Sequence, residues 1–299
     1  MRAATSMPAG HAGDSASGRH RALGEILRLD PERDHQRIVY LSSAFEFPFD
    51  MTRSLEFALF RTFAVPTIGA LLDRTHEFAA RAQKRYDDTD LILSQIYEHG
   101  YESERGRAAL RRMNHIHRRF EIANEDFLYV LSTFVYEPVR WIARFGWRDT
   151  VETERLAFFH FWRAVGARMN IRDIPASYEA FEAFNVAYER TWFRYSEASR
   201  RVAEATRTMF LDWFLPRPLH WLGRPVVHAL MDEPLLRAFG FPEPGPALRR
   251  VVSGALRLRS RVVRRLPERS RPRLRSELRH RTYPRGYTTG QLGPLPHDT

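Results

Sequence analysis

The chain has 299 residues, 43% of them hydrophobic, a formal net charge of +11 and no cysteine. This length and composition are typical of a globular protein with one or two domains and a sizeable core. The lack of cysteine excludes disulfides, thiolate ligands for haem or zinc, and a cysteine nucleophile.

The positive charge is concentrated at the C-terminus. Residues 246–299 hold 14 arginines and three acids, which leaves 33 basic and 33 acidic residues in the rest of the chain. No basic stretch is interleaved with aromatic residues, so we predict no nucleic-acid partner. Residues 1–30 are rich in Ala, Gly and Ser and are predicted to be disordered. They contain no apolar core of a secretory signal, and no run approaches the roughly 18 apolar residues of a membrane span, so we expect a cytoplasmic protein.

Capping residues and helical periodicity predict an all-α protein. Strand alternation and sequence repeats are not evident, which agrees with this class. We expect one multi-helix domain over residues 31–245, with about ten helices and a globin-like core. Residues 84–89 are predicted to form a polar connector. The predicted helices cover about residues 51–63, 66–81, 89–98, 103–120, 127–136, 150–169, 177–195, 198–214, 221–230 and 234–239.

Residues 246–266 form a predicted basic amphipathic helix. Its apolar residues are Leu248, Val251, Val252, Ala255, Leu258 and Val262. This pattern suits either a helix docked on the protein or a peripheral membrane contact through residues 247–265. The last segment, 267–299, combines seven arginines with prolines and glycines and is predicted to be a disordered basic tail.

The stretch 107–147 contains the strongest candidate for a site. On a 3.6-residue period His117 shares a face with Leu110, Met113 and Phe120, while His115 lies toward the arginines. The next helix, predicted to be capped by Asn124 and to end or kink at Pro138, is apolar nearly all round. A histidine on such a face is either a core residue bonded to a carbonyl or a ligand for haem iron.

Other residues offer weaker signals. His160 lies among aromatic residues and is a second candidate haem ligand. Arg53 and Arg61 interrupt an apolar helix, so each either reaches the surface or waits for a carboxylate such as a haem propionate. GxSxG, HExxH, P-loop and GxGxxG motifs are absent. Glu-x-x-His pairs occur only in the flanks, which argues against a di-iron bundle.

The stretch RRMNHIHRRFEIANEDFLYVLSTFVYEPVRW resembles the signature of the MpaB-type oxygenases, relatives of the latex-clearing rubber oxygenases. The resemblance extends upstream through FEFPFDMTRSLEFALFRTFAVPTIGALLDRTHEF and RAQKRYDDTDLIL, and downstream through GARMNIRDIPASYEAF, so that it covers about residues 36–240. It implies an all-α, haem b-dependent oxygenase that cleaves a carbon–carbon double bond in an isoprenoid-like chain. Its partners would be an apolar small molecule and dioxygen.

The resemblance also implies roles for single residues. In rubber oxygenases the proximal ligand is a histidine on the buried helix, and the matching helix here has none. The RMNxxH pattern supplies Arg112, Asn114 and His117, and His117 is the implied iron ligand, with a Tyr129 phenolate as the rarer alternative.

Two further polar residues keep alternative roles. Asn114 is either a pocket-rim or a surface amide, and Asp126 is either a helix-start acid or a catalytic base. The competing class of function is a non-catalytic helical module that binds a membrane surface or a protein through the basic C-terminal helix.

Overall fold

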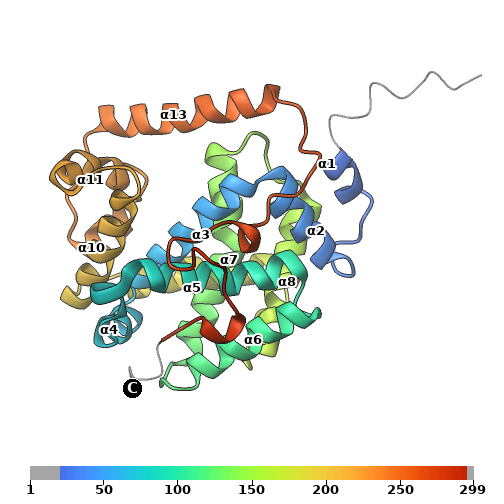
Figure 1. Ribbon diagram of the computed structural model, residues 1–299, viewed down its shortest axis with the longest axis horizontal. Helices are drawn as coiled ribbons and strands as arrows, with labels where there is room; N and C mark the ends of the chain where they lie inside the picture. The colour runs from blue at the N-terminus through green and yellow to red at the C-terminus, as the bar shows by residue number, and fades with distance from the viewer. Residues whose placement is uncertain (1–20, 295–299) are drawn as a thin grey trace, which may run out of the picture.

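The computed structural model describes residues 21–294 and is built from α-helices, with no strand among these residues (Figure 1). The prediction of a single all-α domain is confirmed. The described part holds thirteen α-helices rather than about ten. They are α1 (Arg21–Ile26), α2 (His35–Leu41), α3 (Pro48–Phe63), α4 (Pro66–Arg74), α5 (Glu77–His99), α6 (Glu104–His117), α7 (Asn124–Phe145), α8 (Glu152–Arg168), α9 (Tyr178–Trp192), α10 (Glu197–Asp212), α11 (His220–Ala229), α12 (Glu233–Phe239) and α13 (Pro246–Arg265).

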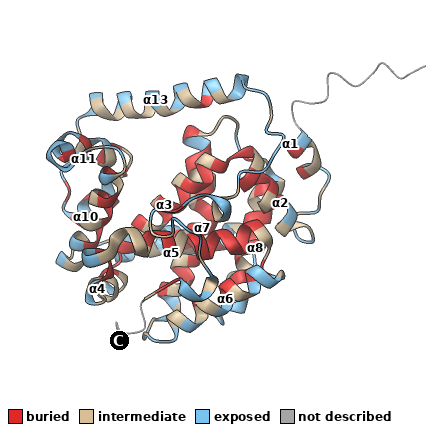
Figure 2. Ribbon diagram, viewed as in Figure 1, coloured by how far each residue is buried: buried red, intermediate tan, exposed pale blue. Residues whose placement is uncertain are grey.

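Helix α7 lies at the centre of the core. It packs against α3, α8, α9 and α13, and buried residues are concentrated on α7 and its neighbours (Figure 2). The helix continues through Pro138 to Phe145, although the sequence predicted that it ends or kinks there. Asn124 is the first residue of α7, and Ala123 takes the cap position without a side-chain hydrogen bond. The free energy gained by burying most sides of α7 is therefore larger than the cost of the backbone hydrogen bond that proline cannot donate.

The predicted polar connector at 84–89 lies inside α5, which runs for 23 residues with a kink at Arg81. The charges there are paired rather than solvated. Lys84 Nζ is 2.7 Å from Asp88, one helical turn away, and Asp87 and Asp88 are both buried. The sequence predicts a loop here because the other partners of these acids lie far away in the chain.

Those partners belong to the C-terminal segment, and the prediction that 267–299 is disordered is wrong for residues 267–294. Tyr283 donates a hydrogen bond to Asp88 (2.5 Å), and the Thr282 amide donates to Asp87 (2.9 Å). Arg275 pairs with Asp90, and Leu292 is fully buried. The segment is poor in apolar residues, and hydrogen bonds and ion pairs with acids on α5 hold it in place.

The N-terminal prediction is likewise corrected in part. Residues 1–20 lie outside the described part of the chain, but residues 21–26 form α1 and bury Ala22 and Ile26. Glu268 accepts hydrogen bonds from the amides of Arg21 and Ala22, at 2.9 and 2.8 Å, and so caps this helix from the C-terminal segment.

The predicted basic helix forms as α13, and among its residues Ser260 alone is buried. It lies at the edge of the molecule and contacts α7 and α11 (Figures 1 and 2). No single described helix is long and apolar enough to cross a membrane. The α3–α4 pair, bent by 96°, passes that test jointly by length and composition.

Candidate functional site

His117 ends α6, and its buried nitrogen is unusual. The Ser103 side chain caps the start of α6 by accepting from the Gly106 amide, and Leu110 and Met113 bury the same face. The imidazole meets the Phe127 ring edge-on, 5.3 Å between centroids. Its Nδ1 is buried and has no hydrogen-bond partner. A buried polar atom without a partner is rare and calls for an explanation such as a ligand.

The protonation state of His117 suits a ligand. Burial, together with the positive charge of Arg85, lowers the pKa of His117 to about 4. The imidazole is therefore neutral at physiological pH, which is the form that binds a metal. His115, by contrast, is exposed, as the helical wheel predicts.

Arg85, which the sequence analysis did not single out, is the second member of the site. It lies on α5 beneath the Phe78 ring, 5.5 Å from its centroid, and donates to the Thr89 hydroxyl one turn away. Burial lowers the pKa of Arg85, and the nearby acids Asp88 and Glu77 offset this effect in part. No ion pair joins Arg85 to a carboxylate in the described residues, so its charge is available to an anionic group.

A narrow cavity of about 30 Å³ lies beside Arg85. It is lined by Glu56, Leu59, Phe63, Phe78, Arg85, Tyr86, Thr89, Thr206, Met209 and Phe210. This volume holds one or two water molecules, so a macrocycle at this place requires the lining side chains to move apart. Phe, Leu and Met dominate the apolar part of the lining, and they adapt more readily than backbone would.

Glu56 is the acid of this cavity. It accepts hydrogen bonds of 2.6 Å from the Tyr86 hydroxyl and from Arg53. Burial raises the pKa of Glu56 to about 7, against the opposing effect of Arg53. A carboxyl group with this pKa exchanges a proton at neutral pH. The Nε of Arg53 is buried without a partner, so Arg53, unlike Arg61, keeps a donor free.

Carboxylates from three other parts of the chain surround the Arg61 guanidinium. Its guanidinium binds both carboxylate oxygens of Glu189, pairs with Asp232 at 2.6 Å and lies 3.5 Å from Glu137. These acids raise the pKa of Arg61 well above its ordinary value. The arrangement gives Arg61 the role of joining α3 to α7, α9 and α12, in place of the propionate contact considered from the sequence.

Tyr129 and Asp126 belong to the same network. The Tyr129 hydroxyl donates to Glu189 at 3.1 Å, and its ring stacks on Tyr188 at 4.9 Å. Burial and the Glu189 charge raise the pKa of Tyr129 far above the usual value, so the phenol is protonated and its proton is held by Glu189. Asp126 accepts from the hydroxyls of Tyr188 (2.7 Å) and Thr67 (2.8 Å), so it is more than a helix-start acid.

The other motif residues make contacts with the backbone. Asn114 donates to the Arg168 carbonyl at 2.9 Å, and Arg112 Nε donates to the Leu292 carbonyl at 2.6 Å. Both therefore join α6 to other parts of the chain. His160 stacks on His35, 6.5 Å between ring centroids, and burial lowers its pKa. In the described residues no group of three or more His, Cys, Asp or Glu side chains is placed to hold a metal ion.

Two of the predicted site residues thus keep a buried nitrogen without a hydrogen-bond partner. His117 offers a neutral nitrogen with no partner, and Arg53 offers a free donor near the cavity, while Arg85 adds a charge that the sequence analysis missed. A neutral imidazole nitrogen can bind iron, and a guanidinium donor can bind a carboxylate such as a propionate. Arg61, Tyr129 and Asp126 form a separate network, and Arg112 and Asn114 act as structural links.

Comparison with known proteins agrees with this architecture. The family model described as "ER-bound oxygenase mpaB/B'/Rubber oxygenase, catalytic domain" matches residues 55–265. The ER-bound oxygenase mpaB' of Penicillium brevicompactum is 30% identical over 82% of this chain and 65% of its own length. The ER-bound oxygenase mpaB of Penicillium roqueforti (strain FM164) is 30% identical over 66% of this chain and 72% of its own length. The chain therefore spans about two thirds of the length of these relatives.

Among solved structures, the latex clearing protein LCP in the closed state matches with a TM-score of 0.53 at 15% identity. The match covers 84% of this chain and 74% of that one. At this identity the match bears on the fold alone. The family match covers most of the chain, so this protein belongs to the family of the ER-bound oxygenases mpaB/B' and the rubber oxygenase catalytic domain.

Proposed function

We propose that the chain is a haem b-dependent oxygenase that cleaves a carbon–carbon double bond in an apolar, isoprenoid-like substrate with dioxygen. The observation that carries the proposal is the buried Nδ1 of His117, which has no hydrogen-bond partner in an imidazole kept neutral by burial and Arg85. Membership of an oxygenase family supports it. Haem, when bound, supplies the redox chemistry with dioxygen, as cofactors do in general.

The chain's own residues would bind and orient. His117 would hold the iron through a ring nitrogen, and Arg85 and Arg53 would bind propionates. Glu56, with a pKa of about 7, would hold or release a proton at its carboxyl oxygen beside the cavity. The aromatic and aliphatic lining would exclude water and favour an apolar chain.

Activity can be tested on the full chain loaded with haemin and chemically reduced to the ferrous state, with an isoprenoid alkene and oxygen. We expect oxygen consumption and carbonyl products in wild type, loss of both in His117→Ala, and retention in His115→Ala. Haemin-loaded wild type that consumes no oxygen with any isoprenoid tried would refute double-bond cleavage while leaving haem binding intact.

The alternative, a non-catalytic module, predicts a colourless chain that takes up no haemin. Two observations favour a membrane contact in addition to the oxygenase activity. The relatives are named ER-bound, and α13 carries apolar residues on its exposed face. A peripheral membrane contact through residues 247–265 is compatible with either function.

A further inference from the structure

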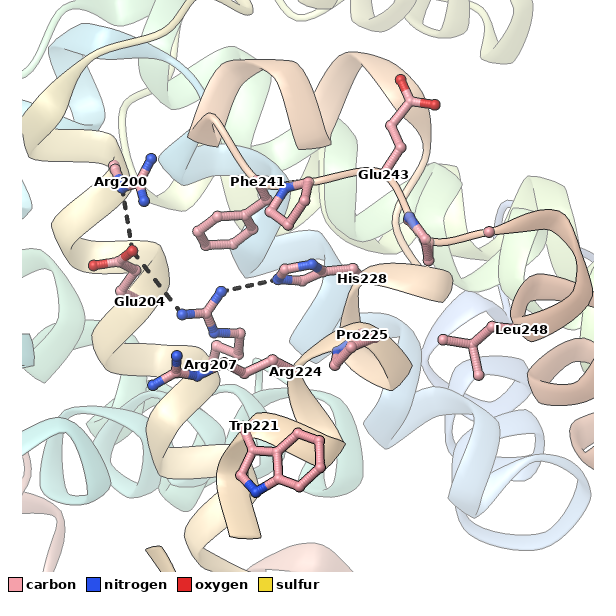
Figure 3. Close-up of a pocket in the computed structure, with 13 residues that line it drawn as sticks. Arg200, Glu204, Arg207, Trp221, Arg224, Pro225, His228, Phe241, Glu243 and Leu248 are labelled. Carbon is pink, nitrogen blue, oxygen red and sulfur yellow. Dashed lines mark hydrogen bonds and ion pairs between the residues drawn. The ribbon is translucent and has the colours of Figure 1, made fainter. Parts of the chain in front are cut away.

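A cavity of about 510 Å³, far larger than the one beside Arg85, lies between α10, α11 and the chain that leads into α13 (Figure 3). Its volume is within the range of about 300–1,000 Å³ that small-ligand sites occupy. The lining includes three arginines, Arg200, Arg207 and Arg224, and two acids, Glu204 and Glu243. Figure 3 shows Glu243 turned away from the arginines.

Arg207 is the residue that makes this cavity a candidate site. It is 6% exposed, and its Nε is buried with no hydrogen-bond partner. Nη1 donates to His228 Nε2 at 2.9 Å, and Nη2 is 4.0 Å from Glu204. The Nε–Nη2 edge of a guanidinium binds phosphate or carboxylate with two parallel hydrogen bonds. That edge of Arg207 lacks such a partner.

The neighbours hold Arg207 in place, and Glu204, which Arg200 shares, offsets its charge in part. Its guanidinium lies over the Phe241 ring at 4.5 Å, and the same ring stacks on His228 at 4.7 Å. Burial and Arg207 lower the pKa of His228 to about 4, so this histidine is neutral at physiological pH. Glu204 is already bonded to Arg200 at 3.1 Å, and no described acid forms an ion pair with Arg224.

The surface beside the cavity is apolar and basic. Trp221, on the cavity wall, is 65% exposed. On α13, Val251, Ala255, Leu258 and Val262 fall within about 60° of one another on a helical wheel. Val251, Leu258 and Val262 are 67%, 59% and 50% exposed. The exposed arginines Arg250, Arg257 and Arg261 lie along one side of this stripe, and no acid lies on α13.

An exposed apolar stripe bordered by arginines is the pattern of a helix that lies in the interface of an anionic membrane. Trp at such a boundary serves the same purpose, with its ring at the headgroup level. Helices α11 and α13 pack on each other, and Leu248 of α13 is part of the cavity wall. The arginine cavity therefore adjoins the helix that carries the apolar stripe, and together they form the surface considered below.

We propose that this surface binds an anionic phospholipid, with the headgroup phosphate held by Arg207 and Arg224 in the cavity and α13 lying in the membrane interface. The charge of the surface selects an anion, and the apolar stripe selects a lipid over a free phosphate. The proposal is independent of haem, because it uses no residue of the His117 site.

The test is co-sedimentation of the full chain with phosphatidylcholine vesicles, with and without phosphatidic acid. Wild type should pellet with the mixed vesicles only. Arg224→Gln and Arg207→Gln should each lower the partition coefficient more than tenfold. Arg217→Gln, which removes the same charge outside the cavity, should lower it about fivefold at most. Leu258→Glu, on the exposed stripe, should abolish binding. If Arg207→Gln fails to fold by circular dichroism, the exposed Arg224→Gln decides.

Three results would overturn the proposal. In the first, Arg224→Gln binds vesicles as well as Arg217→Gln does, while Leu258→Glu no longer binds them. This result would mean that α13 binds the membrane and that the cavity holds no headgroup. Wild type that ignores vesicles but is stabilised by inorganic phosphate, in a way that Arg224→Gln removes, would make the cavity a free-phosphate site. Wild type that responds to neither probe would remove the site altogether.

Discussion

Arg112, in the motif helix α6, donates a hydrogen bond of 2.6 Å to the backbone carbonyl of Leu292, 180 residues later. Lys84 donates to the next carbonyl, that of Gly293, at 2.6 Å. Two residues of the part that resembles the oxygenases thus hold the C-terminal segment along α5 and α6, and this segment belongs to the folded unit.

We therefore expect removal of residues 267–299 to destabilise the fold. Deletion removes the amides and hydroxyls that now donate to Asp87, Asp88 and Glu98 and exposes these acids to water. A hydrogen bond to a charged group contributes about 1.5–3 kcal/mol, so the loss should be several kcal/mol. Thermal unfolding measures it. Arg285→Ala, on an exposed residue of the segment, should change little, and an unchanged melting temperature in the truncated chain would contradict the account.

Arg61→Ala tests the network of α3, α7, α9 and α12. The change removes the cation between Glu189 and Asp232 and leaves Glu137 with Arg140 as its ion-pair partner. Removing one partner from a buried ion-pair cluster costs about 3–5 kcal/mol, which urea denaturation should detect. Arg190→Ala, exposed on α9, is the matched control. If Arg61→Ala keeps its stability but loses haem, Arg61 binds a propionate after all.

Glu56 gives the stability a defined pH dependence. Burial raises its pKa in the folded chain from 4.5 to about 7. Because the folded state then binds the proton more tightly than the unfolded state, the contribution of Glu56 is fully present below about pH 4.5. It is lost as the pH rises through about 7.

We expect Glu56→Gln to be more stable than wild type at pH 8, by about 1–3 kcal/mol, and to lose this advantage at pH 4.5. Urea denaturation at the two pH values measures the difference. An advantage of equal size at both would mean that Glu56 does not titrate in this interval.

The sequence predicted the helical class correctly because apolar periodicity and caps are local signals, and α6 and α7 carry both. The inward orientation of His117 and the outward orientation of His115 followed from the same periodicity. Arg85 was missed because it stands in a polar run whose burial depends on distant partners. The C-terminal segment was missed for a related reason, since its order comes from acids on α5 more than 170 residues away.

The comparison of candidate arginines makes the same point. Arg53 and Arg61 look alike in the sequence, as single charges in an apolar helix. Their partners differ, because Arg61 meets acids from α7, α9 and α12, whereas Arg53 meets Glu56 on its own helix and keeps Nε unpaired. Only the tertiary structure distinguishes an arginine that is already paired from one with a free donor.

The central claim, that His117 is the haem ligand, is tested most directly by titrating purified full chain with haemin and recording the Soret band. The account predicts a saturable band with one haem per wild-type chain and the same band in His115→Ala. His117→Ala should either fail to bind haem or give a shifted band, with the helical circular dichroism unchanged. A wild-type chain that takes up no haemin, or His117→Ala with an unaltered spectrum while His160→Ala loses the band, would contradict it.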